Sequence, residues 1–489
     1  MAKTTASVCK SLGSKVGAAV AAGVLGLAPR ALAQVDMQPL TKLDLFSAGR
    51  DAGFGQDVWK GASADIARAV IPTLAVRPLS PAGVSVARRL LAQSAAAPDG
   101  AGSDADLAAA RVRVLLALGE APLVSSILDH TPNLSQNALL SQTAAEAALD
   151  LGQDDKACAI GEALTASRGD LYWLRLRAYC QALGGKPEAA QLTFSLANQQ
   201  AKDPTLTRLM TVAINGAGDA GAPSLRNGLD FALSRHLKLD LASALPTAPP
   251  AIAEQVTANL AGATPVTTGT PSEPEIIGSL KAAKSFSAFV AAAKLARPGL
   301  AALVQAKAPI AEPLLEASAV LAAGDIDTAQ AIRAVPAPPG APPVDPLDPA
   351  ILDAALSAAV GKPDAQTLDR LMDRGGAGDA KARIRGQAAA AIFASLGGEI
   401  SDGARARFID FDFRHGDASA ARLMMLQADA EAGRVGETVL LALSVAEAGG
   451  AAGPAAADRA RIIRALSQVG RKADAQAFAV EGLLSLEAR

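Results

Sequence analysis

The sequence predicts an all-α protein, an α-solenoid built from tandem helical hairpins. A helix-like run, a break at glycine and a second helix-like run recur along the chain, whereas the alternating runs typical of strands are nearly absent. The composition suits close helix packing, because hydrophobic residues make up 50% of the 489 residues and aromatic residues only 3%. This balance excludes a disordered chain, a collagen-like chain and a cysteine-rich scaffold.

Residues 1–33 have the pattern of a signal peptide that is removed on export. Three lysines precede an apolar run at 16–27, which is too short to cross about 30 Å of hydrocarbon. The small-x-small sequence at 31–33 then offers a cleavage site before Gln34. A short buried helix is the alternative interpretation. We expect a periplasmic protein with no membrane span in the mature chain.

Residues 34–97 differ in character and are expected to form an N-terminal helical cap. They contain Phe46, Phe54 and Trp59, followed by a segment punctuated by prolines. A solenoid exposes an apolar face at its open end, and a cap would cover that face. A partner-docking surface is the alternative.

Residues 98–244 carry the clearest repeat, which is predicted to consist of helical hairpins. Glycine ends a helix at little cost because it adopts positive φ, and a small residue lets the next helix approach closely. Each break has a small residue five positions later: Gly119 with Val124, Gly152 with Ala157, and Gly184 with Ala189. The glycines are 33 and 32 residues apart, a spacing typical of tandem helical repeats.

The third unit resembles a tetratricopeptide repeat. With Ala189 as the small residue of its second helix, three residues fall at consensus positions of that family: Trp173, Leu176 and Gly184. Arg177 and Cys180 depart from the consensus, which prefers a small residue and a tyrosine there. The resemblance implies stacked helical hairpins and no particular activity.

Two proline-rich stretches, 245–275 and 335–349, interrupt the helical pattern, since proline fixes φ and lacks an N–H donor. Each is either a flexible linker or a surface loop. Residues 276–334 are predicted to form a helical segment and residues 350–489 C-terminal helical repeats. The pattern of break and small residue returns there: Gly324 with Ala329, Gly433 with Thr438, and Gly470 with Ala475.

Cys158 and Cys180 are a candidate disulfide. They lie on two consecutive predicted helices, about ten residues to either side of the intervening turn, so that a rise of about 1.5 Å per residue brings them to similar heights. An oxidising periplasm would permit the bond. Two buried free thiols are the alternative.

The sequence offers no catalytic, cofactor or metal site, so we expect a protein that is not an enzyme and needs no cofactor. Its three histidines, His130, His236 and His415, have no partner at metal-ligand spacing, and phosphate-binding and nucleophile-elbow motifs are absent. A lytic-transglycosylase-like cell-wall enzyme is the enzymatic alternative. Its catalytic glutamate has no distinguished candidate in the C-terminal third, where the glutamates considered are Glu399, Glu431, Glu437 and Glu447.

One cluster near residue 410 is a candidate partner-binding site. It combines three arginines with three phenylalanines, types that supply much interface energy: Arg405, Arg407, Phe408, Phe411, Phe413 and Arg414. The alternation around Phe411 and Phe413 favours an extended segment. The alternative is that these phenylalanines fill the core where helices meet.

These features favour a non-catalytic periplasmic scaffold or adaptor that binds other proteins of the cell envelope. Stacked hairpins provide extended surfaces for partners. The formal net charge of −2 gives no electrostatic reason to expect a nucleic-acid partner. A peptidoglycan-associated accessory protein is the second hypothesis, which the scarcity of aromatic residues for sugar stacking weakens.

Overall fold

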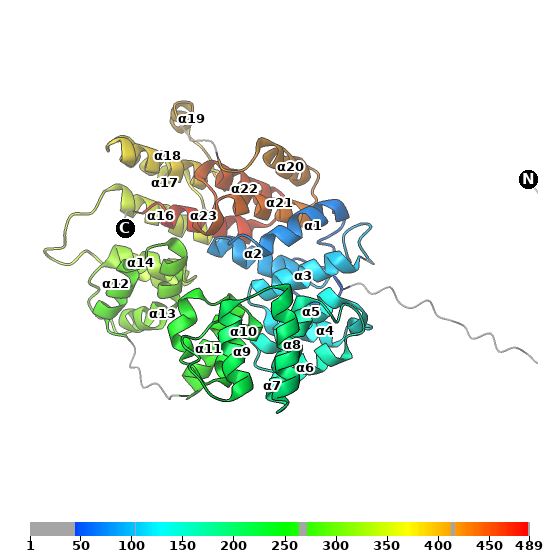
Figure 1. Ribbon diagram of the computed structural model, residues 1–489. Coiled ribbons are helices and arrows are strands. Elements are labelled where there is room, and N and C mark those ends of the chain that lie inside the picture. Colours follow the sequence, from blue (N-terminus) through cyan, green and yellow to red (C-terminus); the bar gives the residue numbers. More distant parts are fainter. Residues whose placement is uncertain (1–44, 103, 264–270, 412–415, 488–489) are drawn as a thin grey trace, which may run out of the picture. The chain divides into compact units, whose positions relative to one another are not determined.

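The computed structural model describes residues 45–102, 104–263, 271–411 and 416–487 (Figure 1). These residues belong to one compact unit of the chain. The predicted signal peptide, residues 1–33, and the first part of the predicted cap, residues 34–44, lie outside the described residues. All regular structure of the described part is helical, apart from two isolated β-bridges. The predicted all-α class is therefore confirmed there.

The first half of the described chain contains these elements, with 3-10 helices labelled η: α1 (Ala64–Val70), η1 (Ile71–Ala75), α2 (Pro81–Ala92), α3 (Ala105–Ala117), α4 (Ala121–Asp129), η2 (Leu134–Gln136), α5 (Ala138–Asp150), α6 (Asp154–Ala163), α7 (Leu171–Leu183), α8 (Pro187–Gln200), α9 (Pro204–Asn215), α10 (Gly228–His236), η3 (Leu241–Thr247) and α11 (Pro250–Ala263). The second half contains α12 (Glu273–Lys281), α13 (Phe286–Gln305), α14 (Pro313–Ala322), α15 (Ile326–Arg333), α16 (Leu347–Val360), α17 (Ala365–Gly376), α18 (Ala380–Ala394), α19 (Asp402–Phe408), α20 (Ala420–Glu431), α21 (Val435–Ala448), η4 (Gly450–Ala452), α22 (Ala456–Gln468) and α23 (Lys472–Leu484).

Helical hairpins form at the predicted glycine breaks. Five of the six predicted glycines have positive φ and separate two helices that pack against each other: Gly119, Gly152, Gly324, Gly433 and Gly470. The small residue five positions after each is buried: Val124, Ala157, Ala329, Thr438 and Ala475. The local rule of glycine turn and small residue therefore describes these hairpins correctly.

The third hairpin, α7 with α8, differs from the prediction by one residue. Gly184 has φ −78°, and the positive φ falls on Gly185, the second glycine of the pair. The buried small residue is accordingly Ala190, five positions after Gly185, while Ala189 is only half-buried. The predicted register was wrong here because either of two adjacent glycines can take the left-handed conformation, and packing selected the second.

The proline-rich stretches differ from each other. In the stretch 245–275, α11 begins at Pro250, so the expectation of a linker or loop is wrong for residues 250–263. Proline is tolerated there because the first residues of a helix need no N–H donor. In the stretch 335–349, residues 335–346 are without helix and α16 begins at Leu347. Its prolines inside this coil remove the N–H donors that a helix would require.

Two large apolar cores account for most of the buried residues of the described chain, and a third, small core surrounds Phe231 on α10. One large core is built from α5 to α10 and includes Trp173, Tyr179 and Phe194. The other large core joins the two ends of the chain, since it contains residues of α1 to α3 together with residues of α12 to α23. Phe46, Phe54 and Trp59, the aromatic residues of the predicted cap, are buried in this second core.

The N-terminal helices pack on both halves of the molecule. η1 and α2 contact α3, while α1 and α2 contact α21, and α2 also contacts α23 (Figure 1). Gly436 permits the closest approach, because its N–H donates to the Val58 carbonyl at 2.8 Å and a Cβ there would lie 2.5 Å from that oxygen. Residues 45–92 thus lie between the hairpins that follow them and those at the other end of the chain.

Candidate functional site

Cys158 on α6 and Cys180 on α7 lie at disulfide-bonding distance, with their Cα atoms 5.7 Å apart. Consecutive helices α6 and α7 pack against each other and bring the two sulfurs together, as the spacing predicted. Both residues are half-buried and lie at the edge of the core formed by α5 to α10. The pair therefore ties one hairpin to the next.

The predicted cluster of arginines and phenylalanines is only partly described, because Phe413 and Arg414 lie outside the described residues. Phe408 and Phe411 stack with their ring centroids 4.5 Å apart, and both are half-buried against the core. Arg407 pairs with Asp373 at 2.5 Å and with Asp369 at 3.4 Å, both on α17. The described part of the cluster is thus engaged mainly with the chain itself.

A second exposed feature adjoins this cluster. Arg405 is largely exposed, and Ile409 between the two phenylalanines is 84% exposed. The structure therefore leaves Ile409, next to the cluster in sequence, accessible, while the rings of Phe408 and Phe411 contribute to packing.

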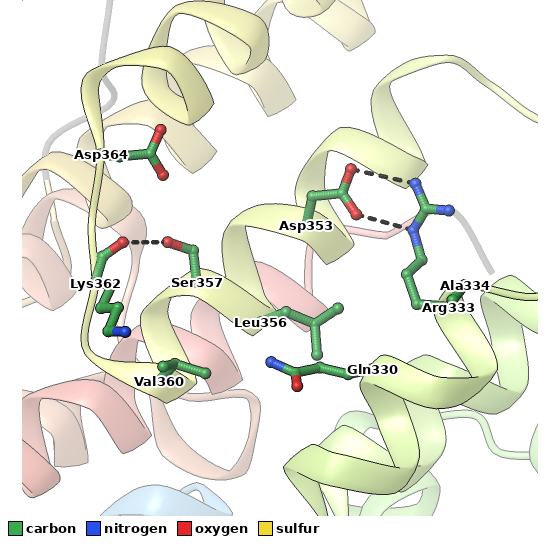
Figure 2. Close-up of a pocket in the computed structure, with 9 residues that line it drawn as sticks. All are labelled: Gln330, Arg333, Ala334, Asp353, Leu356, Ser357, Val360, Lys362 and Asp364. Atoms are coloured by element: carbon green, nitrogen blue, oxygen red, sulfur yellow. Dashed lines mark hydrogen bonds and ion pairs between the residues drawn. The ribbon is translucent and has the colours of Figure 1, made fainter.

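A shallow cavity that is open to solvent lies between α15 and α16 and has a volume of about 600 Å³ (Figure 2). Its lining comes from α15, from α16 and from the turn that leads into α17: Gln330, Arg333, Ala334, Asp353, Leu356, Ser357, Val360, Lys362 and Asp364. Arg333 and Asp353 form a two-pronged ion pair across the two helices, with N–O distances of 2.9 and 3.2 Å. At the opposite end of the cavity lie Lys362 and Asp364 (Figure 2).

A pair of acidic residues on α5 faces the N-terminus of α10. Glu146 Oε2 accepts a hydrogen bond from the Gly228 N–H at 2.9 Å, one of the N–H groups that a helix start leaves unsatisfied. A Cβ at Gly228 would lie 3.0 Å from this oxygen and 3.0 Å from Asp150 Oδ1. The two carboxyl oxygens therefore lie within about 6 Å of each other. Asp150 Oδ1 is buried without a hydrogen-bond partner among the described residues.

This environment makes the two carboxyl groups hard to ionise together. Burial, followed by the Glu146 charge, raises the pKa of Asp150 to about 8. Burial also raises the pKa of Glu146, against the opposing effect of the Gly228 N–H, and raises that of Tyr172 well above its usual value. Neither the cavity between α15 and α16 nor the smaller one beside Asn198 is lined by these residues, and the start of α10 lies against them. The pair is suited to holding α10 rather than to reacting with a substrate.

Two of the four glutamates considered for catalysis, Glu437 and Glu447, have structural partners in the N-terminal segment, whereas Glu399 and Glu431 are exposed. Glu437 Oε2 accepts the Ser63 N–H at 2.6 Å, and Glu447 Oε2 accepts the Thr73 hydroxyl at 2.7 Å. Each contact joins α21 to the N-terminal segment across 374 residues of sequence. Their local sequence gave no sign of these partners, since the partners lie at the other end of the chain.

Two further features bear on binding to ions and membranes. No group of three or more histidine, cysteine, aspartate or glutamate residues within the described ranges is arranged to hold a metal ion. α13, at residues 286–305, is long and apolar enough to cross a membrane by length and composition alone. It also carries Lys294, Arg297 and Pro298, and it packs against α12 and α14.

Sequence reasoning missed the acidic pair and the cavity. The pair had a readable signal, because Glu146 and Asp150 are four residues apart in an otherwise apolar alanine-rich run, and such residues share one face of a helix. The cavity had none, since it brings together two helices and the turn that precedes a third.

Comparison with protein-family models, with curated proteins and with solved structures finds no match to this chain. The resemblance of the third hairpin to a tetratricopeptide repeat therefore depends on its residues alone.

Proposed function

We propose that this chain is an exported helical-repeat scaffold or adaptor that binds other proteins of the cell envelope and has no catalytic activity of its own. The observation that carries the proposal is the recurrent hairpin, closed by a positive-φ glycine and followed five residues later by a buried small residue. Repeated units of this kind stack through their neighbours and offer long surfaces to a partner.

In the proposed arrangement the hairpins form a solenoid in which neighbouring hairpins are not always consecutive along the chain. The hairpins of α20 to α23 stack on α1 and α2, and the hairpins of α3 to α8 continue on the other side. The N-terminal segment would then serve as an internal unit of the stack rather than as a cap on an open end.

We propose that the protein is located in the periplasm. The support for this location is the basic, apolar and small-residue order of residues 1–33, together with the two cysteines at bonding distance. Mass spectrometry of the exported protein under non-reducing conditions is expected to find an N-terminus at Gln34 and a bond between Cys158 and Cys180. If the protein is found in the cytosol with residues 1–33 retained and both thiols free, the proposed periplasmic location is wrong.

Site-specific crosslinking in cells tests the binding function. A photoreactive residue at Leu192, an exposed leucine on α8, or at exposed Ile409 is expected to capture the same envelope proteins in repeated experiments. A matched probe at exposed Asp155 on α6 serves as the control. Failure to recover any reproducible protein partner would contradict the proposal.

Two parallel assays address the alternatives. Co-sedimentation with purified peptidoglycan sacculi in the absence of other proteins would favour the peptidoglycan-associated hypothesis. Clearing of a cell-wall zymogram by the purified chain would favour the enzyme.

A further inference from the structure

A long connection joins α15 and α16, the two helices that border the cavity. Residues 335–346 connect them as a coil that contains six prolines. A coil of this composition lacks the N–H donors for a helix that could fill the space. None of the residues that line the cavity belongs to this coil. The connection therefore leaves the cavity uncovered.

The carboxylates of the cavity are already engaged. Both oxygens of Asp353 accept hydrogen bonds from Arg333. Both oxygens of Asp364 accept from Thr367, one from its N–H and one from its hydroxyl, each at 2.8 Å, because Asp364 caps the start of α17. Neither side chain needs a ligand to satisfy its charge.

Two donors of the cavity, in contrast, have no partner. Among the described residues, no hydrogen bond or ion pair reaches the Lys362 ammonium group or the Gln330 side-chain amide. The Lys362 carbonyl accepts the Ser357 hydroxyl at 2.5 Å, which fixes the turn that carries the lysine. The cavity thus offers an exposed cation on a fixed turn and an exposed amide donor, and their counterpart would be an anion.

The remaining wall is apolar. Val360 is 42% exposed, and Leu356 lies one helical turn before it on the same face of α16. In the view of Figure 2, Val360 lies between Lys362 and Gln330. An apolar group bound beside the anion would cover Val360 and remove it from water.

We propose that this cavity binds a carboxylate that carries an apolar substituent, as at the carboxyl terminus of a peptide that ends in an aliphatic residue. Lys362 pairs with the carboxylate, the Gln330 amide donates a hydrogen bond to it, and Val360 and Leu356 contact the aliphatic group. This inference deepens the proposed binding function, on which it rests, by naming the class of ligand. A small branched-chain acid has the same chemistry and is the other source of such a group.

The test measures binding of acetyl-Gly-Ala-Leu to the purified full chain by calorimetry, with the C-terminal amide of the same peptide as a matched ligand. We expect saturable binding of the free acid and a loss of at least roughly tenfold on amidation, because amidation removes the charge that pairs with Lys362. Lys362→Gln is expected to weaken binding of the acid roughly tenfold and to leave binding of the amide unchanged. Lys284→Gln, an exposed lysine outside the cavity, is the matched control and is expected to have no effect.

Three results would overturn the site: no saturable binding of the free acid, equal binding of acid and amide, or unchanged binding in Lys362→Gln. If 3-methylbutanoate binds as tightly as the peptide and with the same dependence on Lys362, the site holds and its ligand is a free small acid. Crosslinking to envelope proteins that persists in Lys362→Gln would leave the adaptor function standing when the cavity fails the test. The two proposals can therefore fail separately.

Discussion

The hairpins of residues 138–236 and the joined ends of the chain are stabilised by contacts of different range. In the first region the ties are comparatively local: Cys158 and Cys180 are 22 residues apart, and Gly228 meets Glu146 across 82 residues. At the chain ends, polar contacts join residues that are 374 to 418 apart in sequence, from the contact of Ser63 with Glu437 to that of Gly53 with Arg471.

The two regions also use buried charge differently. At the chain ends, buried acids meet arginines and backbone N–H groups; Glu481, for example, accepts from Arg459 at 2.8 Å and from the Ala82 N–H at 2.6 Å. In the first region buried Asp230 likewise meets Arg226, but Glu146 and Asp150 face each other without an arginine between them. Alanine-rich hairpins have similar apolar faces, so we infer that the buried ion pairs select one register between distant hairpins, because any other register leaves a charge unpaired.

Removal of a buried acid at the chain ends is expected to have the largest effect. Glu481→Ala leaves Arg459, which is almost completely buried, without its carboxylate and the Ala82 N–H without its acceptor. The free energy of unfolding is expected to fall by about 3–5 kcal/mol in urea titrations. Asp65→Ala, at an exposed residue of an ion pair on α1, is the control and is expected to change little. A loss for Glu481→Ala as small as that of the control would contradict the proposed role of buried charge.

The disulfide gives the next largest expected effect, and it tests the local region. Cys158→Ala is expected to reduce the free energy of unfolding by roughly 3 kcal/mol, because the bond restricts a loop of the unfolded chain. The double variant with Cys180→Ala should match the single variant. An oxidised wild-type chain whose melting temperature is insensitive to reductant would argue against a stabilising bond.

The acidic pair predicts a pH dependence confined to the local region. The pKa of Asp150 is raised to about 8 in the folded chain, so the folded state holds its proton more tightly than the unfolded state. The resulting stabilisation is complete below pH 4 and is lost as the pH rises toward 8. Asp150→Asn removes this titration, so the variant is expected to lose less stability than the wild type when the pH is raised from 4 to 9.

Unfolding measured at both pH values, with Asp155→Asn as an exposed control on α6, checks this expectation. If wild type and Asp150→Asn lose stability equally between pH 4 and pH 9, the pKa of Asp150 is not raised in the folded chain.

The smallest expected effect concerns the close approach of α10 to α5. Gly228→Ala places a Cβ 2.9 Å from the Leu149 Cβ and 3.0 Å from both carboxyl groups, and it is expected to cost about 1–2 kcal/mol of stability. Gly278→Ala on α12 meets nothing within 4 Å and is expected to gain up to about 1 kcal/mol. Urea titrations of both variants compare the sites, and equal shifts would contradict close packing at Gly228.

Much of the local structure could be predicted from the sequence, and the failures have physical reasons. The glycine turns at 119, 152, 324, 433 and 470 were predictable because positive φ and helix termination are local properties. The adjacent glycines 184 and 185 were not resolved, since both can adopt positive φ. α11 was missed because prolines were taken to exclude helix where Pro250 instead begins one.

In the candidate sites, too, local pairings could be predicted from the sequence and distant ones could not. The pairing of Cys158 with Cys180 followed from the spacing of consecutive helices, whereas the partners of Glu437 and Glu447 lay 374 residues away. Lys362 and Gln330 carried no pattern of their own, and only the space between α15 and α16 relates them.

The sequence by itself determined where helices end and which small residues their partners cover, because these depend on neighbours a few residues away. The tertiary structure decided that the ends of the chain meet, that Glu146 and Asp150 share one buried place, and that a cavity stays open beside Lys362. The hydrophobic effect is non-directional, so an apolar helix face does not specify which other face will cover it. Distant pairings are therefore fixed only when all the helices pack together.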